Sequence, residues 1–200
     1  MSRLLSDHAG NTDQVVLLPS ALEDPSKSPP GLYRVGLLTA CISISAFFIA
    51  LVIAYYWRKM TPPFWDPVPI PKTLLLSTIL ILTSSATFEI ARRLFRRGHW
   101  RMASHFFLAT ASLGMAFLAS QLTAWRSLAM HGAFLKKNPH SSFFFLFTGL
   151  HAAHLIGGLV LLFIVVLSTA KRRELVDVAT QYWHFLGVLW IALYYVLMTA

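Results

Sequence analysis

The sequence predicts an all-α integral membrane protein, a bundle of five transmembrane helices with the N-terminus inside and the C-terminus outside. Hydrophobic residues make up 56% of the chain and charged residues only 12%, with a mean hydropathy of +0.60. The apolar residues are collected into five long runs. Spanning a hydrocarbon core of about 30 Å takes roughly 20 residues at 1.5 Å each, and helices satisfy their own backbone hydrogen bonds in lipid. The five runs therefore predict five membrane-spanning helices.

Each predicted helix is defined by the place where its apolar run begins and ends. The runs begin at Val35, Thr73, Met102, Ser142 and Tyr182, and they end near Trp57, Ala91, Trp125, Ala170 and Met198. Aromatic residues typical of the membrane interface lie near these borders, namely Trp57, Trp65, Trp100, Trp125 and Trp183. Five prolines in residues 61–71 exclude a helix there and predict an extended loop.

The N-terminal segment differs in composition from the rest of the chain. Residues 1–32 are polar and hold only a short apolar stretch, residues 15–18, which is too short for a signal peptide. We expect a flexible polar tail over residues 1–32 and a membrane domain over residues 33–200.

The orientation is predicted from the distribution of cations between the two sides. One side carries Arg3, Lys27, Arg34, Arg92, Arg93, Arg96, Arg97, Arg101, Lys171, Arg172 and Arg173, and the other carries Arg58, Lys59, Lys72, Arg126, Lys136 and Lys137. The positive-inside rule then places the N-terminus in the cytoplasm and the C-terminus outside. Because the cations stand in short clusters between apolar runs, the net charge of +9 indicates membrane lipids as partners and no nucleic acid.

Small residues recur every four positions in three of the predicted helices. The stripes are Ala46, Ala50 and Ala54, then Ser112, Ala116, Ser120 and Ala124, then Gly149, Ala153 and Gly157. Such stripes let helix backbones approach closely in lipid. They predict helices that pack on one another and on helices of a partner.

A few polar residues fall within the predicted spans, where each is expensive and raises a functional question. They are Glu89, His105, Gln121, His151, His154 and His184. The pattern predicts structural hydrogen-bonding residues, with no catalytic, cofactor-binding or metal-ligating role. Arg92 and Arg93 follow Glu89 at ion-pair spacing, and the His-x-x-His of His151 and His154 lacks further ligands at its own depth.

Two other function classes stay open at this point. His105 and His184 are both about one turn from the inner border, so they could face each other across the edge of a heme b. The chain would then be a heme-binding membrane electron carrier. A small transporter is the third class, although the spans contain neither inverted repeats nor helix-breaking pairs of glycine and proline.

Four segments resemble subunit III of the heme-copper oxidases, the cytochrome c oxidase subunit 3 family, in its short five-helix bacterial form. Residues 143–157 (FFFLFTGLHAAHLIG) and 182–185 (YWHF) are similar to that family's "F..LTGLH..H...G" and "YWHF" signatures. The run from Leu113-Gly114 through Phe117-Leu118 to Gln121 and Trp125 resembles "LG..FL..Q..EW", and residues 73–76 and 84–87 resemble "NT.LL...SS.T". The order of the four segments also matches.

The resemblance implies a non-catalytic subunit of the aerobic respiratory chain in the bacterial cytoplasmic membrane. Such a subunit flanks subunit I and other oxidase subunits, stabilises subunit I and supports its proton uptake. Heme and copper are expected in the partner subunits and none in this chain, with a bound phospholipid as a further expectation. Related proteins serve quinol oxidases and accompany nitric oxide reductases, so the electron donor and acceptor stay open.

Two positions depart from the family pattern. Many members carry a membrane glutamate shortly before the pair Phe47-Phe48, where this chain has Ile44-Ser45-Ala46. An aspartate that often follows "YWHF" is replaced by Gly187.

Overall fold

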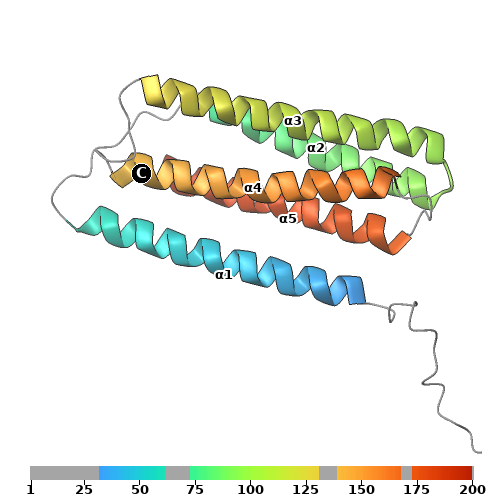
Figure 1. The fold of residues 1–200 in the computed structure, drawn as a ribbon, viewed down its shortest axis with the longest axis horizontal. Coiled ribbons are helices and arrows are strands. Elements are labelled where there is room, and N and C mark those ends of the chain that lie inside the picture. Colours follow the sequence, from blue (N-terminus) through green and yellow to red (C-terminus); the bar gives the residue numbers. More distant parts are fainter. Residues whose placement is uncertain (1–31, 62–72, 131–138, 168–172, 200) are drawn as a thin grey trace, which may run out of the picture. The chain divides into compact units, whose positions relative to one another are not determined.

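Five long α-helices account for nearly all of the described chain (Figure 1). The structure, a computed structural model, describes residues 32–61, 73–130, 139–167 and 173–199. The helices are α1 (Leu32–Met60), α2 (Thr73–Arg96), α3 (Trp100–Met130), α4 (Pro139–Leu167) and α5 (Arg173–Met198). Each is long and apolar enough to cross a membrane, which confirms the prediction of an all-α bundle of five spans. The predicted N-terminal tail and proline-rich loop lie outside the described residues.

The helix borders extend beyond the apolar runs, most of all in α5. This helix begins at Arg173, so the predicted start at Tyr182 lies in its third turn. Hydropathy detects only the apolar centre of a span, and the first turns of α5 carry Glu174 and Asp177. The assignment of Trp183 to the membrane interface was therefore wrong, because its side chain is fully buried in the bundle. The predicted end of the fourth run, Ala170, lies outside the described residues.

A tight turn at Gly98 joins α2 to α3. Gly98 has a φ of +84°, the left-handed region that glycine enters without a steric penalty. The Gly98 amide donates to the Phe95 carbonyl oxygen and the His99 amide to that of Leu94, each at 3.0 Å. These two bonds form a Schellman motif, which satisfies the last carbonyls of α2 and reverses the chain at once. The turn makes α2 and α3 an antiparallel pair.

Helices α2 to α5 form a closed ring in which α2 packs on α3, α3 on α4, α4 on α5 and α5 on α2. Large aromatic side chains fill its centre, and the ring of Phe117 packs edge-on against Trp190 at 4.8 Å between centroids. Helix α1 contacts this ring of helices through side chains. The aromatic ring of Tyr55 packs against those of Phe143 and Phe147 of α4, with 5.5 and 5.8 Å between ring centroids.

The predicted stripes lie only in part at helix contacts: Ser120 and Ala124 of α3 are buried, and Ser120 Oγ lies 2.7 Å from Ser77 Oγ of α2. Two glycines outside the stripes also lie at close contacts. A Cβ at Gly114 of α3 would lie 3.0 Å from Trp183 of α5, and one at Gly158 of α4 would lie 3.2 Å from the same ring. The stripe of α1 (Ala46, Ala50 and Ala54) is exposed, so its predicted role in packing within this chain was wrong. A stripe with a strict period of four winds around a helix of 3.6 residues per turn and leaves the buried face.

Candidate functional site

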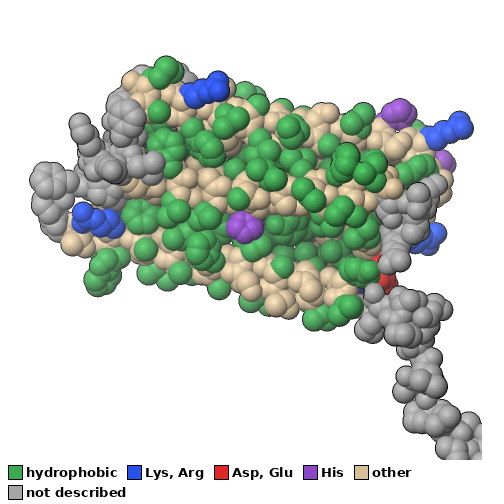
Figure 2. Space-filling view, viewed as in Figure 1, with side chains coloured by type: hydrophobic (Ala, Val, Ile, Leu, Met, Phe, Trp, Pro, Cys, Tyr) green, Lys and Arg blue, Asp and Glu red, His purple; other side chains and the backbone are tan. Residues whose placement is uncertain are grey.

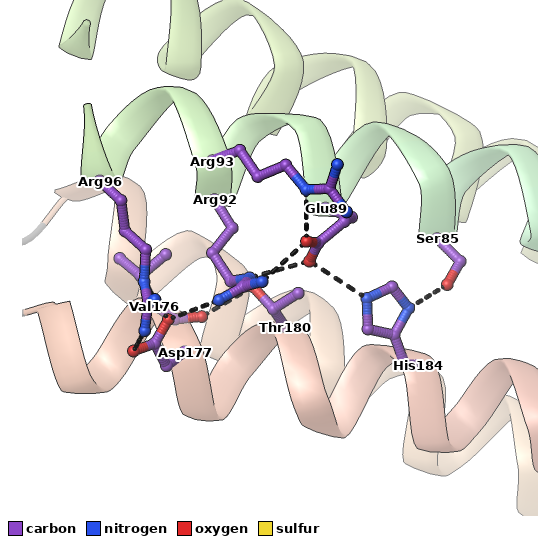
Figure 3. A network of polar contacts seen from close by, with 9 residues as sticks. All are labelled: Ser85, Glu89, Arg92, Arg93, Arg96, Val176, Asp177, Thr180 and His184. Atoms are coloured by element: carbon purple, nitrogen blue, oxygen red, sulfur yellow. Dashed lines mark hydrogen bonds and ion pairs between the residues drawn. The ribbon is translucent and has the colours of Figure 1, made fainter. Parts of the chain in front are cut away.

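A network of charged and polar side chains links α2 to α5 near the end of the bundle where α2 terminates (Figure 3). Glu89 lies at its centre. Its Oε1 is 2.7 Å from Arg92 Nη2 and 2.8 Å from Arg93 Nε, and its Oε2 is 2.8 Å from Arg92 Nε. The predicted ion pairs of Glu89 with Arg92 and Arg93 are thus present in the structure.

Asp177 of α5 is the second carboxylate of the network, and it was not among the residues predicted from the sequence. Arg96 donates to it through two nitrogens, with Nη2 at 2.6 Å from Oδ2 and Nε at 3.1 Å from Oδ1. Arg92 Nη1 reaches the same Oδ1 at 3.3 Å, so this arginine bridges Glu89 and Asp177. Asp177 precedes His184 by two helical turns and so shares its face, a signal that would have found it had α5 been extended beyond its apolar run.

His184 connects this cluster to the interior of the bundle. Its Nδ1 is hydrogen-bonded to Ser85 Oγ of α2, and its Nε2 lies 3.7 Å from Glu89 Oε2. The His184 side chain is 40% exposed and that of Glu89 21% exposed, so the network opens on the side of the bundle between α2 and α5. Ser85 and His184 are joined by a hydrogen bond, and Glu89 lies beside them, whereas Arg92, Arg96 and Asp177 form an electrostatic clamp.

Position 187 faces the same site. A Cβ at Gly187 would lie 4.0 Å from Ser85 Oγ, in ordinary van der Waals contact. The aspartate that the family pattern places here would therefore point its carboxylate toward the Ser85 end of the network. This chain has only Glu89 and Asp177 as carboxylates in the network drawn in Figure 3.

The two histidines of the His-x-x-His pattern do not share a site. His151 is fully buried between Phe117 and Trp190, with ring centroids 5.6 and 5.0 Å away. His154 lies toward α1, where its ring is 5.8 Å from that of Phe48, and its Nδ1 contacts the Leu150 carbonyl oxygen of its own helix at 2.7 Å. A spacing of three residues leaves about 60° between side chains, which is enough to separate the two rings.

The expected interhelical hydrogen bonds are absent from His151. Within the described residues neither ring nitrogen has a hydrogen-bond partner, and the same holds for Gln121 Oε1. The other end of the Gln121 amide is satisfied, because Nε2 donates to Ser77 Oγ at 2.8 Å, and Ser77 also bonds to Ser120 at 2.7 Å. This serine and glutamine group joins α2 to α3 as a structural contact.

The pair of histidines for the alternative heme site is not assembled. His184 lies between α2 and α5 with both ring nitrogens directed at Ser85 and Glu89. His105 is exposed on α3. Among the described residues, no three side chains of histidine, cysteine, aspartate or glutamate come together as a metal site would require.

The family model and the curated relatives that match this chain all belong to one family. The model of cytochrome c oxidase subunit III matches residues 29–199 of this chain. The probable cytochrome c oxidase subunit 3 of Mycobacterium tuberculosis is 28% identical over 182 residues, which cover 86% of this chain and 90% of that protein. The cytochrome c oxidase subunit 3 of Corynebacterium diphtheriae is 31% identical, with 82% and 86% covered, and that of Synechocystis is 29% identical, with 82% and 74% covered.

Proposed function

Because the chain belongs to the cytochrome c oxidase subunit III family, we propose that it is the non-catalytic subunit III of a heme-copper terminal oxidase in a bacterial cytoplasmic membrane. The observation that carries the proposal is the match of the family model over residues 29–199, nearly the whole of the chain. In this role the chain flanks subunit I, stabilises it and supports its proton uptake, while heme and copper reside in the partner subunits.

The electrostatic clamp between α2 and α5, together with the ion pairs of Glu89, supports the stabilising role. Charged groups inside a membrane protein are costly unless they are paired, and here three arginines surround two carboxylates. The clamp fixes the relative position of two helices at one end of the bundle. A subunit whose helices hold a fixed arrangement presents a fixed surface to its partner.

The hydrogen-bonded pair of Ser85 and His184 supports the role in proton uptake. These groups lie at the end of the bundle that carries Arg92, Arg93 and Arg96, the cytoplasmic end by the positive-inside rule. A partly exposed histidine can collect a proton and pass it along a hydrogen bond. Within the proposal they serve the catalytic subunit, since no oxygen chemistry is assigned to this chain.

The experiment that tests the proposal is purification of the tagged chain from its native membrane in a mild detergent. We expect a larger subunit to co-elute and to carry the heme absorption bands, and oxygen consumption to follow the same fraction. A stable, lone, coloured protein would overturn the proposal in favour of a heme-binding electron carrier. A second measurement removes the chain and follows oxygen consumption and proton pumping per catalytic subunit, both of which should fall.

A further inference from the structure

Two polar side chains of α5 lie on the outside of the bundle at a depth where the membrane is hydrocarbon. Helix α5 has 26 residues, so it is about 39 Å long at 1.5 Å per residue, compared with about 30 Å for the hydrocarbon core. Gln181 and His184 follow the first residue of the helix, Arg173, by about 12 and 16 Å. A centred helix extends only about 4–5 Å beyond the hydrocarbon at each end, so both side chains lie within it.

Neither of these side chains is fully paired within the described chain. His184 is 40% exposed, and its Nε2 lies 3.7 Å from Glu89 Oε2, too far for a hydrogen bond, although its Nδ1 is bonded to Ser85. Gln181 is exposed and makes no hydrogen bond with another described residue. Unpaired polar groups are costly in lipid, and membrane proteins cover them with protein or water. Lipid alone therefore does not suit this surface.

The same side of α5 has the spacing of a helix-packing seam. Gln181, His184, Val188 and Ile191 follow one another at steps of three, four and three residues. Alternating steps of this kind keep one stripe turned toward a neighbouring helix. Val188 is 66% and Ile191 42% exposed, and Leu82 of α2 is 46% exposed and lies one turn from Ser85. We call the surface formed by Leu82, Ser85, Gln181, His184, Val188 and Ile191 the α2–α5 face.

The opposite side of the bundle, formed by α3 and α4, is suited to lipid. On the side seen in Figure 2, hydrophobic side chains dominate between the two ends, and the Lys and Arg side chains lie at the ends. Its exposed apolar side chains include Met115 of α3 and Val160 of α4, at 58% and 55%. The polar groups therefore distinguish the α2–α5 face as the surface that another protein covers.

The charge beside the α2–α5 face argues against a second copy of this chain as that protein. Three arginines and two carboxylates form the adjoining network, which has a net charge of +1, from +3 and −2. Two copies facing each other would bring these positive groups together. A phospholipid headgroup stays at the membrane surface and does not reach the depth of His184. A transmembrane helix of a different protein reaches this depth and can carry a matching polar side chain.

We propose that the α2–α5 face seats a transmembrane helix of the heme-bearing catalytic subunit, an inference that rests on the function proposed above. Glu89 Oε2 lies on the Nε2 side of His184 and favours a hydrogen on that nitrogen, so the partner helix provides an acceptor oxygen there. The net positive charge of the network favours a carboxylate as this acceptor. The contact brings the pair of Ser85 and His184 directly against the subunit whose proton uptake it serves.

The test introduces the photoreactive residue p-benzoylphenylalanine in place of Val188 in the tagged full chain, expressed with its native partners. The same residue in place of Val160 is the matched control, because both are exposed valines on opposite sides of the bundle. Membranes are illuminated, and crosslinked peptides are identified by mass spectrometry. We expect position 188 to crosslink to a transmembrane segment of the heme-bearing subunit that holds an acidic residue, and position 160 to give no such product.

A second pair of variants measures the contact without a crosslinker. Val188→Trp should lower the amount of heme-bearing subunit recovered per tagged chain roughly ten-fold, because a bulky side chain overpacks a close contact. Val160→Trp should leave this amount unchanged. Both side chains are exposed, so neither variant disturbs the interior of the bundle.

Co-elution of the unmodified chain with the heme-bearing subunit tests the proposed function separately. Co-elution combined with crosslinking from position 160 and none from position 188 would overturn the inference and leave the function standing. A product of position 188 with a second copy of this chain, or with no protein, would overturn the inference in the same way. Elution of the unmodified chain alone would overturn the function and the inference together.

Discussion

Arg96 Nη2, in the last turn of α2, lies 2.6 Å from Asp177 Oδ2 in the second turn of α5. This ion pair joins residues that are 81 positions apart in the chain, and its extension through Arg92 joins residues that are 85 apart. Because the Asp177 side chain is only 11% exposed, the pair is shielded on the carboxylate side, while the arginine reaches the surface.

The first prediction concerns Asp177→Asn, which removes the negative charge from the clamp. Arg96 then loses its carboxylate partner, and Arg92 keeps only Glu89. The free energy of unfolding should therefore fall by about 1–3 kcal/mol. The measurement is the thermal midpoint of the purified complex. Glu174→Gln, an exposed acid one turn earlier on α5, is the matched control and should leave the midpoint unchanged. Equal thermal midpoints in the two variants would show that the electrostatic clamp contributes nothing to the stability of the complex.

The second prediction concerns Glu89→Gln. The amide keeps the shape of the side chain but leaves Arg92 and Arg93 without their carboxylate, so assembly of the complex should weaken more than turnover. Oxygen consumption and proton pumping are measured per assembled complex and compared with wild type. Loss of pumping with subunit content unchanged would contradict this expectation and make Glu89 an obligatory proton carrier.

The third prediction compares two glycines. Gly114→Ala should lower stability by about 1–3 kcal/mol, because the new Cβ would lie 3.0 Å from the buried Trp183 ring. Gly187→Ala meets Ser85 Oγ at 4.0 Å and should be neutral or stabilising by about 0.5–1 kcal/mol, since alanine is the better helix former. Thermal midpoints of the two variants decide the point, and a larger loss in Gly187→Ala would show that α3 and α5 are not packed as described.

The fourth prediction concerns His151→Phe. Both ring nitrogens of His151 are buried without a hydrogen-bond partner in the described chain, so an apolar ring of similar size should maintain or raise stability by about 1 kcal/mol. His184→Phe is the contrasting variant, and it should destabilise because Ser85 and Glu89 lose their contact. Heme and metal content of the purified complex is measured alongside. A loss of either in His151→Phe would identify His151 as a ligand.

The fifth prediction concerns orientation. The cation bias places the N-terminus in the cytoplasm and the C-terminus outside. A reporter enzyme that is active only in the cytoplasm should work when fused to the N-terminus, and one active only outside should work at the C-terminus. Activity with the two reporters exchanged would reverse the topology.

The spans and the Glu89 ion pairs could be predicted because both depend on local sequence. An apolar run of sufficient length requires a helix in lipid, and a spacing of three or four residues brings side chains together on any helix. Asp177 was missed because it precedes the apolar run of α5. The burial of Trp183 could not be read from local sequence, because the residues that cover it lie on α2, α3 and α4. The separation of His151 from His154 likewise depends on which neighbour packs against each side of α4.

The Schellman turn at Gly98 also has a consequence for biogenesis. It closes the α2–α3 pair with a link of only three residues, so these two helices can leave the translocation machinery as one hairpin soon after synthesis. Arg92 and Arg96 are then already in place near the membrane surface when α5, which is made later, enters with Asp177. We expect α5 to dock onto a prepared arginine pair, which makes the carboxylate of Asp177 the group that sets the register of its insertion.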